Sequence, residues 1–116
     1  MSNDYPKKPV SHGVVRISEN VIRSIATVAA KEIDGVADLA IQKNGILAAF
    51  RRSEPVTVQV INDMVEITVR LILEDGARLT VVAEQVQENI KENVQSMTGV
   101  IVSKVHVIAS DIMFED

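Results

Sequence analysis

The sequence predicts an α+β fold in which two helices cover one face of an antiparallel sheet. The element order β-α-β-β-α-β is that of a ferredoxin-like two-layer sandwich, whose usual strand order is 4-1-3-2. Three observations predict it. Apolar residues recur at helical spacing in two segments and alternate with polar residues in others. The apolar residues are mostly branched aliphatics, with no Trp, one Tyr and two Phe, which suits sheet faces. The length of 116 residues fits one core rather than two.

The N-terminal part is predicted to contain a lead, a strand and a helix. Residues 1–12 are polar with prolines at positions 6 and 9, and we expect a disordered lead rather than a signal peptide. The apolar run Gly13–Ile17 predicts the first strand. Ser18 is a natural N-cap for the first helix, whose apolar face ends near Ile33. Gly35 is expected to end this helix in a left-handed conformation.

The segment 36–55 is predicted to be a long, variable connection within a single domain that spans residues 13–116. Asn44-Gly45 interrupts it, and residues 46–52 could form a short helix. Connections of this length are often functional or mobile.

The second half of the domain is predicted to be a hairpin, a helix and a last strand. Residues 56–61 and 65–71 alternate on either side of Asn62-Asp63, and Asp75-Gly76 ends the hairpin. The second helix runs from Leu79 to Met97 and is stopped by Gly99. Its apolar side comprises Leu79, Val82, Val86, Ile90, Val94 and Met97. Residues 100–109 then alternate as a strand.

Composition excludes several classes of function. The formal net charge of −4 disfavours nucleic-acid binding, and the shortage of aromatic residues removes the platforms on which bases stack. No apolar run approaches the length that spans a bilayer, so direct membrane insertion is not expected. The absence of Cys favours an intracellular setting, and we expect a cytoplasmic protein.

The chain offers no motif for catalysis, and we expect a non-enzymatic protein without cofactor or metal. Its two histidines are His12 and His106, and neither lies near a nucleophile motif. The glycines are isolated rather than grouped in a phosphate-binding loop. Glu84, Glu88 and Glu92 repeat along a helical stripe that is better explained by solvation than by metal binding.

Two sets of residues are candidates for contact with a partner. In the predicted strand order, Arg16, Arg70, Lys104 and His106 project from the outer face of the sheet and could hold an anion or an acidic partner. The alternative is an ordinary charged face balanced by Glu66. On the second helix, the exposed side of Gln85, Glu88, Glu92 and Gln95 could dock a partner, or it could simply be solvated.

The C-terminal residues Ile112-Met113-Phe114 are apolar and stand beside acidic neighbours. They are expected either to pack back on the core or to form an interface, because exposed apolar patches mark contacts.

Several segments together resemble the alkaline shock protein family, small proteins common in Gram-positive bacteria and associated with envelope stress. The resemblance lies in GVVRIS, AAKEIDGV, the hairpin VTVQVINDMVEITVRLIL and, above all, VAEQVQENIKENVQSMTGVIVSKVHV. It implies a non-enzymatic cytoplasmic role in cell-envelope stress homeostasis. It also implies self-association into a homo-oligomer and a membrane-anchored protein partner that holds some members near the membrane. A few members are linked to control of fatty-acid synthesis.

A second function from another class remains open beside this one. A ferredoxin-type domain could be a regulatory sensor of a small anion bound near Arg16 and Arg70. An oligomer that ignores ligands favours the first function, whereas a monomer stabilised by one metabolite favours the sensor.

Overall fold

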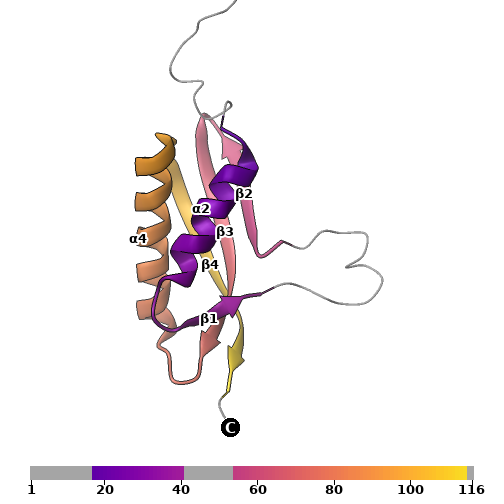
Figure 1. The fold of residues 1–116 in the computed structure, drawn as a ribbon, viewed down its shortest axis with the longest axis vertical. Coiled ribbons are helices and arrows are strands. Elements are labelled where there is room, and N and C mark those ends of the chain that lie inside the picture. Colours follow the sequence, from indigo (N-terminus) through magenta and orange to yellow (C-terminus); the bar gives the residue numbers. More distant parts are fainter. Residues whose placement is uncertain (1–16, 41–53, 115–116) are drawn as a thin grey trace, which may run out of the picture.

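The computed structural model describes residues 17–40 and 54–114, and these form two layers (Figure 1). In these ranges, helices α2 (Glu19–Lys31) and α4 (Leu79–Thr98) lie on one face of a four-stranded sheet. The strands are β1 (Val36–Leu39), β2 (Val56–Ile61), β3 (Met64–Glu74) and β4 (Val102–Met113). The predicted α+β two-layer class is confirmed. The predicted lead 1–12, most of the strand at 13–17 and the helix at 46–52 lie outside the described residues.

Helix α2 begins as predicted and ends earlier. The Ser18 hydroxyl accepts from the backbone N–H groups of Asn20 and Val21, at 3.0 and 3.3 Å, and so caps the first turn. The helix ends at Lys31 with Glu32 as its C-cap in right-handed conformation. Gly35 does have a positive φ of 99°, but it turns the chain into β1 instead of ending the helix. The prediction that Gly35 ends the helix is therefore wrong, because the C-cap is Glu32, three residues earlier.

The hairpin of β2 and β3 has the predicted two-residue turn. Ile61 pairs with Met64, and the two turn residues Asn62 and Asp63 have φ of 52° and 65°. Positive φ at both central positions is the type I′ geometry that matches the twist of the flanking strands. β3 then continues to Glu74, where Asp75-Gly76 turns the chain, as expected.

Helix α4 ends at Thr98 and is capped, as predicted, by Gly99, which has a left-handed φ of 78° and donates its N–H to the carbonyl of Gln95. Its four buried residues are spaced by four and face the sheet: Val82, Val86, Ile90 and Val94. Leu79 and Met97, predicted on the same side, are exposed at the two ends of the helix. The buried stripe is thus shorter than predicted because the terminal turns extend past the core.

The strand order differs from the predicted 4-1-3-2. β3 is central, with β1 and β2 both antiparallel to it on one edge and β4 parallel to it on the other. Because β4 pairs directly with β3, no strand lies between them, and Ile17 is in a bend. The crossover through α4 returns the chain so that β4 runs in the direction of β3. The sheet is therefore mixed.

β1 is a strand in a segment that the sequence predicts to be a connection. Val36 and Leu39 are buried, and β1 pairs with Leu71–Leu73 of β3. Four residues are too few to show alternation, so tertiary pairing decides their conformation.

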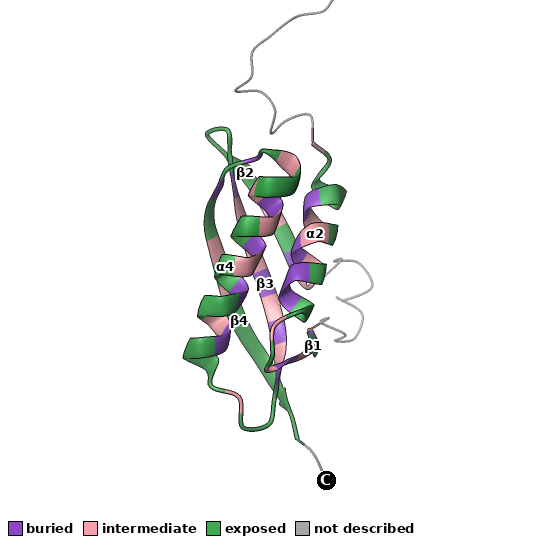
Figure 2. Cartoon of the chain, turned by 60° about the vertical axis from the view of Figure 1, so that its left-hand side comes forward, coloured by how far each residue is buried: buried purple, intermediate pink, exposed green. Residues whose placement is uncertain are grey.

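The core lies between the helices and the sheet and is entirely apolar (Figure 2). β3 contributes every second residue to it: Val65, Ile67, Val69, Leu71 and Leu73. The described residues include no buried polar or charged residue. The buried side of the sheet therefore has a packing role, and functional groups must be sought on the surface.

Candidate interaction surfaces

The outer face of the sheet carries the polar residues that alternate with the core residues of β3. Both described helices lie on the opposite face, so neither covers Glu66, Thr68 or Arg70. In the neighbouring strand β4, Lys104 pairs with Glu66 and His106 pairs with Thr68. Paired residues of parallel strands point to the same side. Glu66, Arg70, Lys104 and His106 therefore share one face.

The structure thus brings three of the four predicted contact residues together. Arg70, Lys104 and His106 lie on adjacent strands, whereas Arg16 lies outside the described residues, as does His12. The Glu66 carboxylate is 3.4 Å from His106 Nε2, and the two form an ion pair when the imidazole is protonated. Glu66 thus lies beside one of the basic side chains of this face.

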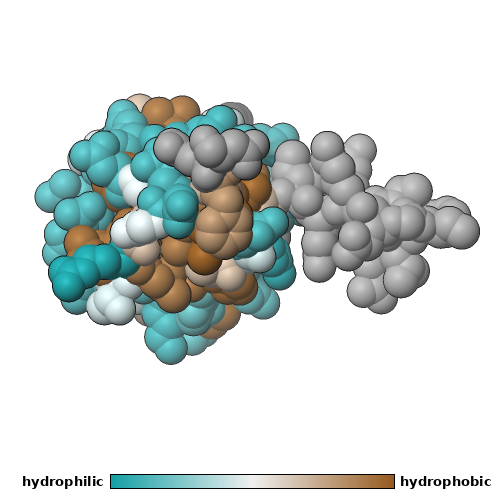
Figure 3. All heavy atoms as spheres, turned by 90° about the horizontal axis from the view of Figure 1, so that it is seen from below, coloured by the Kyte–Doolittle hydropathy of each residue, from teal (hydrophilic) through white to brown (hydrophobic). Residues whose placement is uncertain are grey.

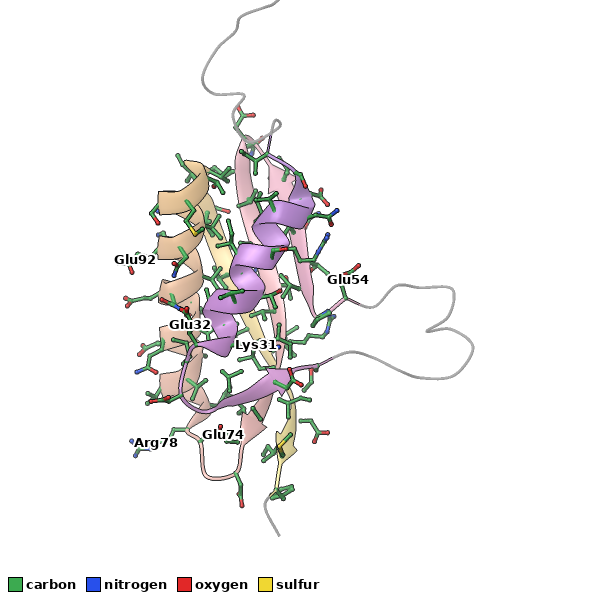
Figure 4. The ribbon with its side chains drawn as sticks, in the orientation of Figure 1. Lys31, Glu32, Glu54, Glu74, Arg78 and Glu92 are labelled. Atoms are coloured by element: carbon green, nitrogen blue, oxygen red, sulfur yellow. The ribbon has the colours of Figure 1, made fainter. Side chains whose placement is uncertain are left out.

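The outward side of α4 presents three of its four predicted residues to solvent. Gln85, Glu88 and Glu92 are exposed, and Figure 4 shows Glu92 pointing away from α2. Gln95 differs, because it is half-buried and its Oε1 accepts from the Val102 N–H at 3.0 Å. Gln95 thus holds the start of β4 through its side-chain oxygen.

A shallow groove of about 350 Å³ runs between α4 and β4. Its walls are Gln87, Glu88 and Lys91 on the helix and residues 102–106 on the strand. Gln87 Nε2 donates to the Val105 carbonyl at 3.0 Å and so occupies part of the outer edge of β4. Sequence reasoning missed Gln87, because nothing in a helical repeat of polar residues tells which one reaches a strand edge.

A second groove, of about 250 Å³, lies between α2 and α4 and is mainly apolar. It is lined by Ser24, Ile25, Val28, Ala29, Glu32, Asn93 and Met97. Val28 and Met97 are 59% and 66% exposed. Asn89 joins the helices beside this groove, donating from Nδ2 to the Ala29 carbonyl at 2.8 Å and to Glu32 Oε1 at 3.1 Å. Figure 4 shows Glu32 on the side of α2 toward α4.

The C-terminal apolar residues do not pack on the core. β4 continues through Met113, and Ile112, Met113 and Phe114 are 44%, 52% and 70% exposed. Seen from below in Figure 3, apolar side chains gather at this end of the molecule. The expected packing on the core is therefore not observed, and the interface stays a prediction.

Within residues 17–40 and 54–114, no group of three or more His, Cys, Asp or Glu side chains could hold a metal ion. Over the same ranges, neither helix has the length and apolar run that crossing a bilayer requires.

Comparison with known proteins shows which family the sequence matches. The model of the alkaline shock protein family, described by its cell envelope-related function, matches residues 7–114. The uncharacterized protein YqhY of Bacillus subtilis (strain 168) is 31% identical over 107 residues, which cover 89% of this chain and 79% of that protein. No solved structure is significantly similar to the chain.

Proposed function

Because the chain belongs to the alkaline shock protein family, with its cell envelope-related function, we propose that it is a non-enzymatic cytoplasmic adaptor that supports envelope stress homeostasis. It acts through protein contacts and self-association, and a membrane-anchored protein partner brings it to the membrane. A link to control of fatty-acid synthesis is part of the proposal and rests on the family resemblance.

The exposed surfaces of the described residues support this proposal independently of the family. All buried residues in the described ranges are apolar. Neither described helix covers the outer face of the sheet, and a long strand edge and an apolar C-terminal end are exposed among the described residues. Such surfaces suit association with other macromolecules, since contiguous exposed apolar and backbone groups mark interaction sites.

The proposal is tested by affinity purification from the native cell with membranes retained. We expect recovery of a membrane protein or an enzyme of lipid synthesis. Two surface variants then assign the surface: Arg70→Gln with Lys104→Gln on the sheet, and Glu88→Lys with Glu92→Lys on α4. If one double variant loses the partner and the other retains it, the surface that carries the first pair of substitutions is the contacting face. Recovery of neither class of protein by the unmodified chain contradicts the envelope role.

A second candidate is supported by the shared face of Arg70, Lys104 and His106, which could hold a small anion. In this case the chain is a monomer, and one anionic metabolite raises its melting temperature. A thermal-shift screen beside a measurement of native mass separates the two. Retention of the shift in Arg70→Gln would exclude this face as the anion site.

A further inference from the structure

The outer edge of β4 is the longest unpaired strand edge in the described residues. β4 has 12 residues and pairs with β3 on one side only. An edge strand presents backbone N–H and C=O groups that can accept another strand, and proteins commonly block such edges.

The contacts of β4 show which residues face the free edge. Along a strand, the backbone groups of alternate residues point to the same side. The Val105 carbonyl accepts from Gln87 of α4, so Val105 faces away from β3. In the regular register that follows, Val107 and Ala109 also face away, while His106 and Ile108 bond to β3. The free edge is thus built on Val105, Val107 and Ala109.

Side chains of the protein block both ends of this edge. At one end, Gln95 Oε1 accepts from the Val102 N–H and Gln87 Nε2 donates to the Val105 carbonyl. At the other end, Asp111 Oδ1 accepts from the Ile112 N–H at 2.8 Å. Between them, the outward backbone groups of Val107 and Ala109 have no partner among the described residues. The edge is open over a short, central window.

We propose that a second copy of this chain pairs with this window, antiparallel, about a two-fold axis at Val107. The inference rests on the proposed self-association and names its surface. Val107 exchanges both backbone hydrogen bonds with the partner's Val107, and Val105 lies opposite the partner's Ala109. The two sheets become one continuous sheet of eight strands.

The surroundings of the window fit a second copy in this register. On the outer face, Lys104 comes close to the partner's Asp111, so opposite charges meet. On the helix-facing side, the partner's Ile112 comes to the end of the groove formed by Val102, Val105 and Gln87. Ile112 is 44% exposed in the single chain and belongs to this side, because it pairs with the buried Leu73. The same contacts recur by symmetry, as in an isologous dimer.

Proline at position 107 tests the pairing, and position 58 provides a matched control. Val107→Pro removes an outward N–H and leaves the bonds to β3, since Pro is tolerated on edge strands whose N–H faces solvent. Val58 is also half-buried against the core and lies on the opposite edge of the sheet. Its N–H faces outward as well, because Pro55 and Ile61 bond toward β3.

We expect a dimer for the unmodified chain and for Val58→Pro in sedimentation measurements across protein concentration. Val107→Pro should raise the dimer dissociation constant at least about tenfold, because two backbone hydrogen bonds are lost. Gln87→Ala should lower it, since the Val105 carbonyl becomes available to the partner.

A cysteine variant gives a readout that does not require the proline variant to fold. The chain has no Cys, so Val107→Cys introduces a single thiol. Hydrogen-bonded residues of antiparallel strands lie about 5.5 Å apart between Cα atoms, within the range that a disulfide spans. Mild oxidation should therefore link Val107→Cys into a covalent dimer, whereas Val58→Cys should remain monomeric on denaturing gels.

The outcomes separate the two proposals. A monomer at all concentrations overturns both self-association and the β4 pairing. A dimer that persists in Val107→Pro, with no cross-link in Val107→Cys, overturns the pairing and leaves self-association standing. A monomer that captures an unrelated extended peptide at this edge overturns the choice of a second copy.

Discussion

Gly35 lies where the chain between α2 and β1 passes close to α4. Its φ is 99°, and a Cβ built on it would lie 2.7 Å from Val82 Cγ2 and 3.3 Å from Ala77 Cβ. We expect Gly35→Ala to lower the free energy of unfolding by about 2–4 kcal/mol, from left-handed strain plus the clash with a buried side chain. Urea unfolding measures it.

Gly76 is the matched control for this prediction. Its φ is 87°, yet a Cβ there would meet nothing within 4 Å. Gly76→Ala should therefore cost about 1–2 kcal/mol, from the backbone alone. Equal losses of unfolding free energy in the two variants would show that the contact with Val82 is unimportant. If the contact matters, the double variant Gly35→Ala with Val82→Ala should lose less free energy than the sum of the two single variants.

Asn89 completes the C-terminal hydrogen bonding of α2 from the neighbouring helix. The Val28 and Ala30 carbonyls accept from Glu32 and Ile33, and the Ala29 carbonyl between them accepts from Asn89 Nδ2. The last carbonyls of a helix otherwise lack intrahelical donors.

Loss of this bond should destabilise the fold. We expect Asn89→Ala to lower the free energy of unfolding by about 1–2 kcal/mol, the cost of an unsatisfied, half-buried acceptor. Asn89→Asp should lower it further, because a carboxylate cannot donate and would face Glu32. Exposed Gln85→Ala, with a change within about 0.5 kcal/mol, is the control in the same denaturant titration. An unchanged midpoint for Asn89→Asp would contradict the role of Asn89.

At the scale of elements, the β2–β3 turn has a residue less suited to its geometry than glycine. Asp63 adopts a φ of 65°, and Gly is the preferred residue at the second position of a type I′ turn. Asp63→Gly should therefore raise the free energy of unfolding by about 0.5–1 kcal/mol. Thermal unfolding checks this, and Asp63→Ala should show no such gain. A lower melting temperature for Asp63→Gly would mean that the Asp side chain itself stabilises the turn.

The sequence predicts elements well where a local signal is strong. Ser18, Gly99 and the Asn62-Asp63 turn act at the residues where their chemistry indicates, since caps and turns depend on local backbone geometry. β1 lacks such a signal, because a four-residue strand is defined by its partner. Its conformation follows from pairing with β3, which no local pattern reveals.

At the scale of the whole molecule, the position of β4 in the sheet could not be predicted from the sequence. The alternation of residues 100–109 predicts a strand but not its neighbour, and direct pairing with β3 makes β4 an edge. Arg70, Lys104 and His106 still share a face, because alternation is preserved whichever strands are adjacent. Gln87 and Gln95 could not be foreseen in the same way, since their contacts depend on where α4 lies over that edge.

The exposed end of β4 allows stability and association to be separated. Val102 is the last buried residue of the described chain, and the N–H of Asp75 donating to the Met113 carbonyl is a backbone contact of this end. Ile112 and Met113 also pair with Leu73 and Glu74 of β3. Removing residues 112–116 should therefore lower the free energy of unfolding by about 1–3 kcal/mol, because a few backbone hydrogen bonds are lost while the main core stays intact. The same deletion removes Ile112, which the β4 pairing places against the groove of the partner, so dimers should weaken. Sedimentation and urea unfolding of one truncated protein test both expectations. A truncated chain that unfolds readily would show that this end is structural, whereas a stable chain with undiminished dimerisation would place the interface elsewhere.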